Sequence, residues 1–175
     1  MAYRNRSDKD GDDSKKGGEA EVYFGKRFEE VLGIKPVRAN SYRDKVEHVD
    51  YDAKIIGKDG SVHVGSWDVK ACKEGVDKGI ICIEFVSYGN LGWIYGKAKW
   101  IAFLMPCGKF LCVNREDLVE MCERKCWASF VVNKNDALYK MLVRWHLNEK
   151  TGGWSNDIVT YVTTRDLFSL EHWKL

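Results

Sequence analysis

The chain has 175 residues, of which 45% are hydrophobic and 31% charged, and its formal net charge is +2. This length and apolar content favour one domain with one core over two domains. The charge neither requires nor excludes a nucleic-acid partner, because a local basic groove can lie on a near-neutral protein. No apolar run approaches the length of a membrane span.

The N-terminal segment, residues 1–17, is polar and rich in Gly, Asp and Lys. It has little to bury, so we expect a flexible tail followed by a single domain over residues 18–175. The segment lacks the apolar centre of a secretory signal, and the six cysteines are therefore expected to be reduced thiols. Cys82 and Cys112 lie within apolar strands and are expected in the core. These features predict a cytoplasmic protein with no membrane partner.

A helix is predicted over residues 18–32. Its apolar side chains recur at helical spacing and are expected to face the core: Phe24, Phe28, Val31 and Leu32. Gly33 is expected to end the helix. Glu21 precedes Phe24 by three positions and Phe28 by seven, which places Glu21 at the buried edge of the helix.

Residues 48–70 are predicted to form a hairpin with its turn at residues 58–60. Side chains alternate between the two faces of a strand. One face is largely apolar: Val49, Tyr51, Ala53, Ile55, Trp67 and Val69. The other face is apolar near the turn and charged at its open end, where Asp50, Asp52, Asp68 and Lys70 lie together.

The rest of the chain alternates short apolar strands with two helices. We expect strands over 79–89, 100–106 and 109–114, a helix over 115–126 capped by Asn114, short strands near 129–133 and 157–163, and a last helix over 165–173. The strand at 100–106 is apolar on both faces and needs cover on both sides. The predicted class is therefore α/β with α/β/α layering.

Symmetric pairing of the hairpin about Asp59 places Asp50 opposite Asp68 and Asp52 opposite Ser66. Directly opposed side chains lie about 5 Å apart, so the two buried carboxylates repel each other. A divalent cation such as Mg²⁺ or Mn²⁺, which prefers hard oxygen ligands, would relieve that repulsion. The simpler alternative is a strand end neutralised by Lys70. A bulge at Gly65 would shift the register and change the pairing.

These residues resemble the PD-(D/E)XK nuclease superfamily, in particular its small Holliday-junction-resolvase and phage-type endonucleases. The resemblance covers residues 18–106 and is carried by Glu21 on the first helix, Asp50 at the start of the hairpin, and Asp68 with Lys70 on its second strand. Its order of helix, hairpin and strand is that of the family core.

The resemblance implies a three-layer restriction-endonuclease-like core around a central mixed sheet, and metal-dependent hydrolysis of DNA, including branched or junction DNA. It implies that Asp50, Asp68 and the carbonyl of Val69 hold Mg²⁺ or Mn²⁺. Lys70 would orient or deprotonate the attacking water and offset transition-state charge. Glu21 would be an outer ligand or hold a second metal; its alternative is an ordinary acid in the first turns of a helix.

The first metal ligand is left open between Asp50 and Asp52, because the family often has Pro-Asp there and this chain has Val49-Asp50. Glu84, on the strand after the hairpin, is either a further site residue or an ordinary strand acid. Trp93 and Tyr95 are candidates for base stacking or for the core. Four lysines follow the hairpin and could track a phosphate backbone or simply face solvent: Lys73, Lys78, Lys97 and Lys99.

Two other functions fit the same pattern. One is a non-cleaving nucleic-acid-binding or protein-interaction module on a nuclease fold, and the other is the nuclease subunit of a larger DNA-processing complex. DNA is the expected partner, RNA is not excluded, and the resemblance allows a homodimer and a phage origin.

Overall fold

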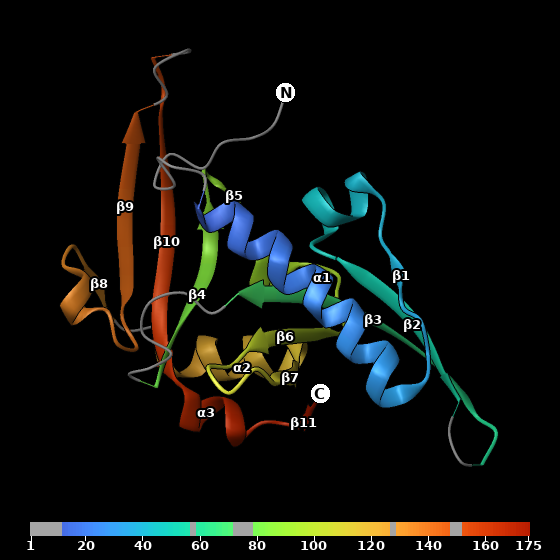
Figure 1. Ribbon diagram of the computed structural model, residues 1–175. Coiled ribbons are helices and arrows are strands. Elements are labelled where there is room, and N and C mark those ends of the chain that lie inside the picture. The colour runs from blue at the N-terminus through green and yellow to red at the C-terminus, as the bar shows by residue number, and fades with distance from the viewer. Residues whose placement is uncertain (1–11, 57–58, 72–78, 127–128, 148–151) are drawn as a thin grey trace.

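The computed structural model describes residues 12–56, 59–71, 79–126, 129–147 and 152–175. It is a mixed α/β structure with two mixed sheets and few helices (Figure 1). This confirms the predicted α/β class. It also shows that the strands divide between two sheets, whereas the sequence suggested one central sheet.

The first sheet contains the hairpin. Its strands lie in the order β1 (Val37–Arg38), β2 (Tyr51–Ile56), β3 (Val62–Ala71), β6 (Trp100–Leu104), β7 (Phe110–Asn114) and β11 (His172–Lys174). β3 and β6 are parallel, and the other neighbours are antiparallel.

The second sheet is built from the strands that follow the hairpin and from the C-terminal part of the chain. Its order is β5 (Asn90–Leu91), β4 (Ile80–Ser87), β10 (Trp154–Thr163), β9 (Met141–Leu147) and β8 (Phe130–Val131). β8 and β9 are parallel, and the other neighbours are antiparallel. Figure 1 shows β4 running across the end of the first sheet toward which β3 points.

The helical elements within the described ranges are α1 (Asp12–Leu32), α2 (Arg115–Cys126), α3 (Thr164–Phe168) and the short turns η1 (Arg43–Glu47), η3 (Trp93–Tyr95) and η4 (Lys134–Asp136). α1 lies across the first sheet (Figure 1). No helix in the described ranges is both long enough and apolar enough to cross a membrane.

α1 begins at Asp12, within the segment predicted to be a tail, while residues 1–11 lie outside the described ranges. Phe24 and Phe28 are fully buried, as their spacing predicts. Val31 and Leu32 are exposed by 46% and 37%, so their predicted burial is wrong.

The end of α1 explains that error. Gly33 adopts a φ of 65°, a conformation that glycine reaches without steric cost, and its N–H donates to the carbonyl of Glu29 at 2.9 Å. After this turn Ile34, rather than Val31 or Leu32, packs against the core beneath α1.

The first sheet has a core on each face. Toward α1 the core contains Ala20, Phe24, Phe28, Tyr51, Ala53, Trp67, Val69, Ala102, Phe110, Cys112 and Leu175. Toward α2 and the second sheet it includes Ile83, Phe85, Trp93, Ile101, Phe103, Leu111, Val113, Leu118 and Cys122. Neighbouring residues of β6 alternate between the two cores, which confirms that this strand is buried on both faces.

The hairpin register agrees with symmetric pairing: Tyr51 pairs with Trp67 and Asp52 with Ser66. Gly65 pairs regularly with Ala53, so the register does not shift there. A Cβ atom at Gly65 would lie 2.3 Å from the ring of Trp67, which explains why this position is a glycine.

Away from the hairpin one prediction is confirmed and two are wrong. Asn114 caps α2 as predicted, with its Oδ1 accepting from the N–H of Glu116 at 2.9 Å. The predicted last helix ends at Phe168, and His172–Lys174 form β11 instead, because they pair with the open edge of β7. Cys82 is exposed rather than in the core, since it faces outward from β4.

Candidate active site at the end of the hairpin

Asp50, Asp68 and Lys70 meet where the β2–β3 ladder ends, and we call these three residues the Asp50–Asp68 site. Asp50 and Asp68 are exposed by only 6% and 2%. The Nζ of Lys70 lies 2.7 Å from Oδ1 of Asp68. Buried carboxylates are rare without a partner, and here the Lys70 ammonium contacts Asp68 and acts on Asp50 at longer range.

The backbone holds the Asp50 carboxylate in place. The N–H of Asp50 donates to the carbonyl of Trp67 at 2.8 Å, and the regular pairs end at Tyr51. The N–H of Val69 donates to Oδ2 of Asp50 at 2.7 Å, so this carboxylate replaces the carbonyl that a longer β2 would supply. The N–H and carbonyl of one strand residue point to the same side. The carbonyl of Val69 therefore faces the side on which Asp50 lies.

Burial dominates the electrostatics of the two acids. It raises the pKa of Asp68 to about 8, despite the opposing effect of Lys70, and Asp50 adds to the rise. Burial also raises the pKa of Asp50, while Lys70 and the N–H of Val69 act to lower it. The negative charge of Asp50 thus favours a proton on Asp68, whose raised pKa lies above neutral pH.

Lys70 stays charged in this environment. Burial alone would lower the pKa of its ammonium group, but Asp68 and Asp50 raise it above its usual value. The ammonium also lies 5.1 Å from the centre of the Trp93 ring. A cation near an indole face is attracted by the ring quadrupole.

Asp52 lies on the same face as Asp50 but has a different partner. Both guanidinium NH groups of Arg43 contact its carboxylate, one of them at 3.3 Å. Arg43 also donates from Nε to Glu47 at 3.0 Å, and Glu47 accepts from Lys97 at 2.8 Å. Asp52 thus belongs to an ion-pair network centred on Arg43 and Glu47 of η1. Because its carboxylate is already paired there, Asp50 is the better candidate for the first metal ligand.

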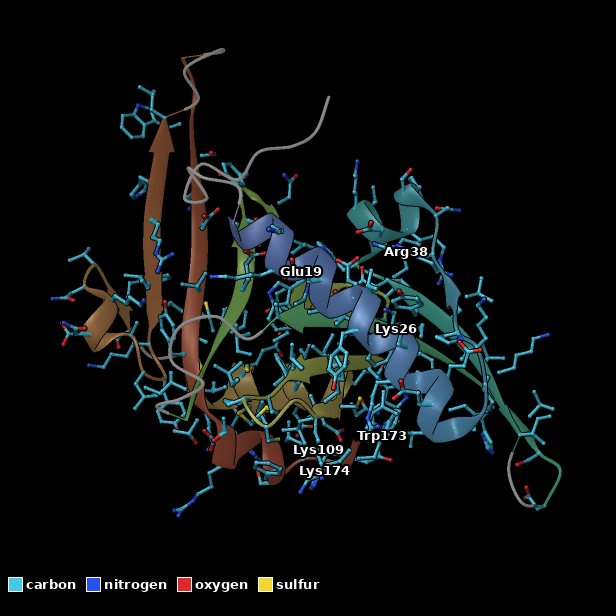
Figure 2. All side chains as sticks on the ribbon, in the orientation of Figure 1. Glu19, Lys26, Arg38, Lys109, Trp173 and Lys174 are labelled. Atoms are coloured by element: carbon cyan, nitrogen blue, oxygen red, sulfur yellow. The ribbon has the colours of Figure 1, made fainter. Side chains whose placement is uncertain are left out.

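Glu21 lies on α1 at the border of the site, as its position at the buried edge suggested. Its carboxylate pairs with Arg38 of β1, which Figure 2 shows beside α1. Burial raises the pKa of Glu21, Asp50 raises it further, and Arg38 lowers it. Glu21 is close enough to Asp50 for their charges to interact, but its direct partner is a cation.

Two residues that the sequence left undecided border Lys70. Trp93 is 8% exposed and belongs to the core between the sheets, so of its two predicted roles the core is confirmed. Glu84 on β4 has its pKa raised by burial, with Lys70 opposing that rise. The Lys70 ammonium also acts on His48, since burial and this charge both lower the pKa of the His48 ring.

The donor set fits a hard divalent cation. Oδ2 of Asp68 is buried and accepts no hydrogen bond in the described structure. Together with Asp50 and the carbonyl of Val69 it offers oxygen ligands only, the kind that Mg²⁺ takes along with water and phosphate. In the described ranges no group of three or more His, Cys, Asp or Glu side chains is arranged as metal ligands. Glu21 is therefore not a third side-chain ligand beside Asp50 and Asp68 in this arrangement.

Of the four lysines that could track a phosphate backbone, two are within the described ranges. Lys73 and Lys78 lie outside the described ranges. Lys97 pairs with Glu47, and Lys99 lies 6.0 Å from the centre of the Trp100 ring.

No family model, no curated protein and no solved structure matches this chain. Its function is therefore inferred from its own residues.

Proposed function

We propose that this protein is a Mg²⁺- or Mn²⁺-dependent endonuclease of the PD-(D/E)XK type that hydrolyses phosphodiester bonds in DNA. The observation that carries the proposal is the buried pair of Asp50 and Asp68, with Lys70 at 2.7 Å and one carboxylate oxygen that accepts no hydrogen bond. A group of this kind is costly to bury, and a metal-dependent active site gives a reason for it.

The arrangement of the first sheet supports the same proposal. α1, the β2–β3 hairpin and β6 occur in this order along the chain, with β4, β5 and η3 between β3 and β6. The strand expected to follow the hairpin, β4, lies in the second sheet, so β6 takes its place beside β3. The first sheet lies between α1 on one face and α2 with the second sheet on the other. We propose that α1, this sheet and α2 form the three layers of that core.

Each residue has a defined role in the proposed reaction. Asp50, Asp68 and the Val69 carbonyl would hold the cation, which when bound supplies Lewis acidity and lowers the pKa of a water ligand. Lys70 lies beside Asp68 and would orient the attacking water and offset negative charge on the phosphate. Glu21, paired with Arg38, would act from outside the ligand set by tuning the charge near Asp50.

The proposed substrate is DNA, with branched or junction DNA as one class and RNA as an alternative to be tested. A homodimer, a cytoplasmic location and a phage origin are part of the same proposal. The homodimer and the phage origin come from the resemblance alone.

A second candidate is a nuclease fold that binds without cutting. The observation in its favour is that three of the four acids near the hairpin end already contact a cationic side chain: Glu21, Asp52 and Asp68 contact Arg38, Arg43 and Lys70. Acids already paired with cationic side chains need a metal ion less for charge neutralisation than unpaired carboxylates would. Asp50, buried and bonded to a backbone N–H rather than a cation, favours the nuclease.

The test is incubation with end-labelled single-stranded, duplex, nicked and four-way-junction DNA, and matched RNA, in Mg²⁺, Mn²⁺, Ca²⁺ or EDTA. Asp68→Asn, which keeps the side-chain shape, is the control for contaminating nucleases. Cleavage by the wild type in Mg²⁺ or Mn²⁺ and by neither the variant nor the EDTA sample is expected. Binding of these substrates without cleavage in any metal would favour the second candidate.

A further inference from the structure

The edge of the second sheet at β9 is open along part of its length. β8 pairs with only two residues of β9, Met141 and Leu142, and Val132, the next residue after β8, is 93% exposed. Beyond Leu142 no strand pairs with this side of β9 in the ranges that the structure describes. Figure 1 shows β9 continuing past β8 along the outer side of β10. An open strand edge is a template for pairing with another strand.

The backbone of Trp145 points toward this open edge. Asn156, its partner on β10, accepts a hydrogen bond at its carbonyl from the N–H of Gly89 at 2.9 Å, on the side of β4. The N–H and carbonyl of one strand residue point to the same side, so the Asn156–Trp145 pair is not hydrogen-bonded. The N–H and carbonyl of Trp145 therefore point away from β10. Met141, four residues earlier, has the same direction, because its N–H donates outward to the carbonyl of Ser129 at 3.0 Å.

The same stretch of β9 carries exposed apolar side chains on one face. Paired residues of antiparallel strands share a face, so Trp145, Leu147 and Trp154 lie together. Trp145 and Trp154 are diagonal neighbours, at a separation that aromatic side chains can span. They are exposed by 64% and 66%, and Leu147 by 43%. Nearer the start of β9 this face covers the core between the sheets through Met141 and Ile158, so the apolar face continues beyond that core.

We propose that this edge of β9 pairs antiparallel with β9 of a second copy, about a twofold axis at Trp145, to form a homodimer. Each Trp145 N–H then donates to the carbonyl of the partner's Trp145. A twofold contact presents the same surface on both copies, so the open edge and the apolar face each meet their own equivalent. This homodimer follows from β9 itself and does not depend on the proposed reaction.

The position of the axis follows from charge and from β8. An axis at Arg144 would place two positively charged side chains directly opposite each other, and like charges in that position destabilise a sheet. An axis at Val143 would bring the partner's Trp145 opposite Met141, where β8 already pairs. An axis at Trp145 places two indoles opposite each other, and aromatic pairs across strands are stabilising. It also gathers Trp145 and Trp154 of both copies on one face.

The apolar area sets the expected strength of the dimer. A covered tryptophan buries on the order of 150–250 Å², so four of them give at most roughly 1,000 Å². Stable protein–protein interfaces bury about 1,200–2,000 Å² in total, and smaller ones belong to weak complexes. The short open edge adds its backbone hydrogen bonds. We therefore expect a reversible dimer with a roughly micromolar dissociation constant.

Analytical ultracentrifugation across the micromolar range tests the interface. The wild type should change from monomer to dimer as its concentration rises. Trp145→Lys should weaken the dimer by at least ~10-fold, because tryptophan is a frequent anchor of interfaces and each substitution acts twice in a symmetric dimer. Leu91→Lys is the matched control and should leave the dimer unchanged. Leu91 is a comparably exposed apolar residue, at 69%, on β5 at the opposite edge of the same sheet.

Amide hydrogen exchange of the wild type, measured by NMR, tests the same edge without a substitution. The Trp145 N–H points to the open edge, so its exchange should slow by ~10-fold or more at concentrations where the dimer forms. The Arg144 N–H points toward β10 and should exchange slowly at every concentration, which makes it the internal control.

Three results would overturn the proposal. They are a wild type that stays monomeric at every concentration, a dimer that Trp145→Lys weakens no more than Leu91→Lys does, and a dimer in which exchange of the Trp145 N–H does not slow. If circular dichroism shows that Trp145→Lys does not fold, the exchange measurement decides. None of these results bears on cleavage, which the metal and EDTA incubations with Asp68→Asn test separately.

Discussion

Asp50 accepts a hydrogen bond from the backbone N–H of Val69 at 2.7 Å, and this contact ties the first candidate ligand to the strand that carries the second. β2 begins at Tyr51, so it offers no backbone carbonyl to the N–H of Val69 on β3. The Asp50 carboxylate accepts that hydrogen bond instead. The position of the Asp50 carboxylate follows from the ladder itself.

Asp50 and Asp52 should differ sharply when each is changed to Ala. Asp50→Ala should abolish cleavage and keep the fold, since it removes a ligand from the site. Asp52→Ala should leave a measurable rate, because Asp52 contacts Arg43 on η1 and not Asp68. Single-turnover cleavage with circular dichroism of both variants checks this. A reversed order of rates would assign the ligand role to Asp52.

Mn²⁺ should stabilise the wild-type protein. A cation between Asp50 and Asp68 replaces the proton that burial favours on Asp68, and binding to the folded state alone adds about 2.7 kcal/mol at 100 times the Kd. For a chain of this size that raises the melting temperature by about 5 to 10 °C. Differential scanning fluorimetry with and without Mn²⁺ measures it. Asp68→Asn should show little shift, and an equal shift in both proteins would place the metal elsewhere.

Lys70→Ala should separate catalysis from folding. The variant should fold and bind DNA and Mn²⁺, because a cation leaves the vicinity of another cation, yet cleave at least ~100-fold more slowly. Single-turnover rates beside melting curves test this, with Lys54→Ala on the exposed part of β2 as the control. If the variant melts much earlier but cuts at the wild-type rate at low temperature, Lys70 is a structural partner of Asp68 and no more.

The stability of the apo protein should fall as the pH rises toward 8. The folded-state pKa of Asp68, about 8, lies above the ordinary aspartate value, so the folded protein binds this proton more tightly than the unfolded chain does. The resulting stabilisation is complete below about pH 4 and is lost as the pH rises through the folded-state pKa. Asp68→Asn lacks this titration. In EDTA, its melting temperature relative to wild type should therefore increase between about pH 5 and 8, and a constant difference would contradict the assignment.

Gly65→Ala should destabilise the hairpin. The new Cβ would lie 2.3 Å from the Trp67 ring, and relief of such an overlap costs about 1–3 kcal/mol. Gly17→Ala is the control, because no atom lies within 4 Å of its Cβ and alanine favours a helix by about 1 kcal/mol. Urea unfolding should show opposite signs for the two variants. Equal effects would mean that the ring moves aside at no cost.

The hairpin was the most predictable part of this protein. Its face alternation and its turn are local, and symmetric pairing places Asp52 opposite Ser66, as observed. Phe24 and Phe28 were equally readable from their spacing in α1. In each case the signal is the spacing of apolar and polar residues within one local segment, which periodicity records.

The partners of the charged residues were not predictable. Arg38 pairs with Glu21 across 17 positions, and Lys97 with Glu47 across 50. Such contacts depend on how the sheets and helices pack, which leaves no periodic signal in the sequence. The division of the strands into two sheets was missed for the same reason.

The parallel pairing of β3 with β6 has a consequence for how the protein folds. Asp68 pairs with Ile101, so the chain between them must first leave the first sheet, form β4 and η3, and return. Local hairpins close early, whereas a long excursion loses more chain entropy before its contacts form. On this ground we expect the two carboxylates to come together with the hairpin before the excursion through β4 and η3 closes around Lys70.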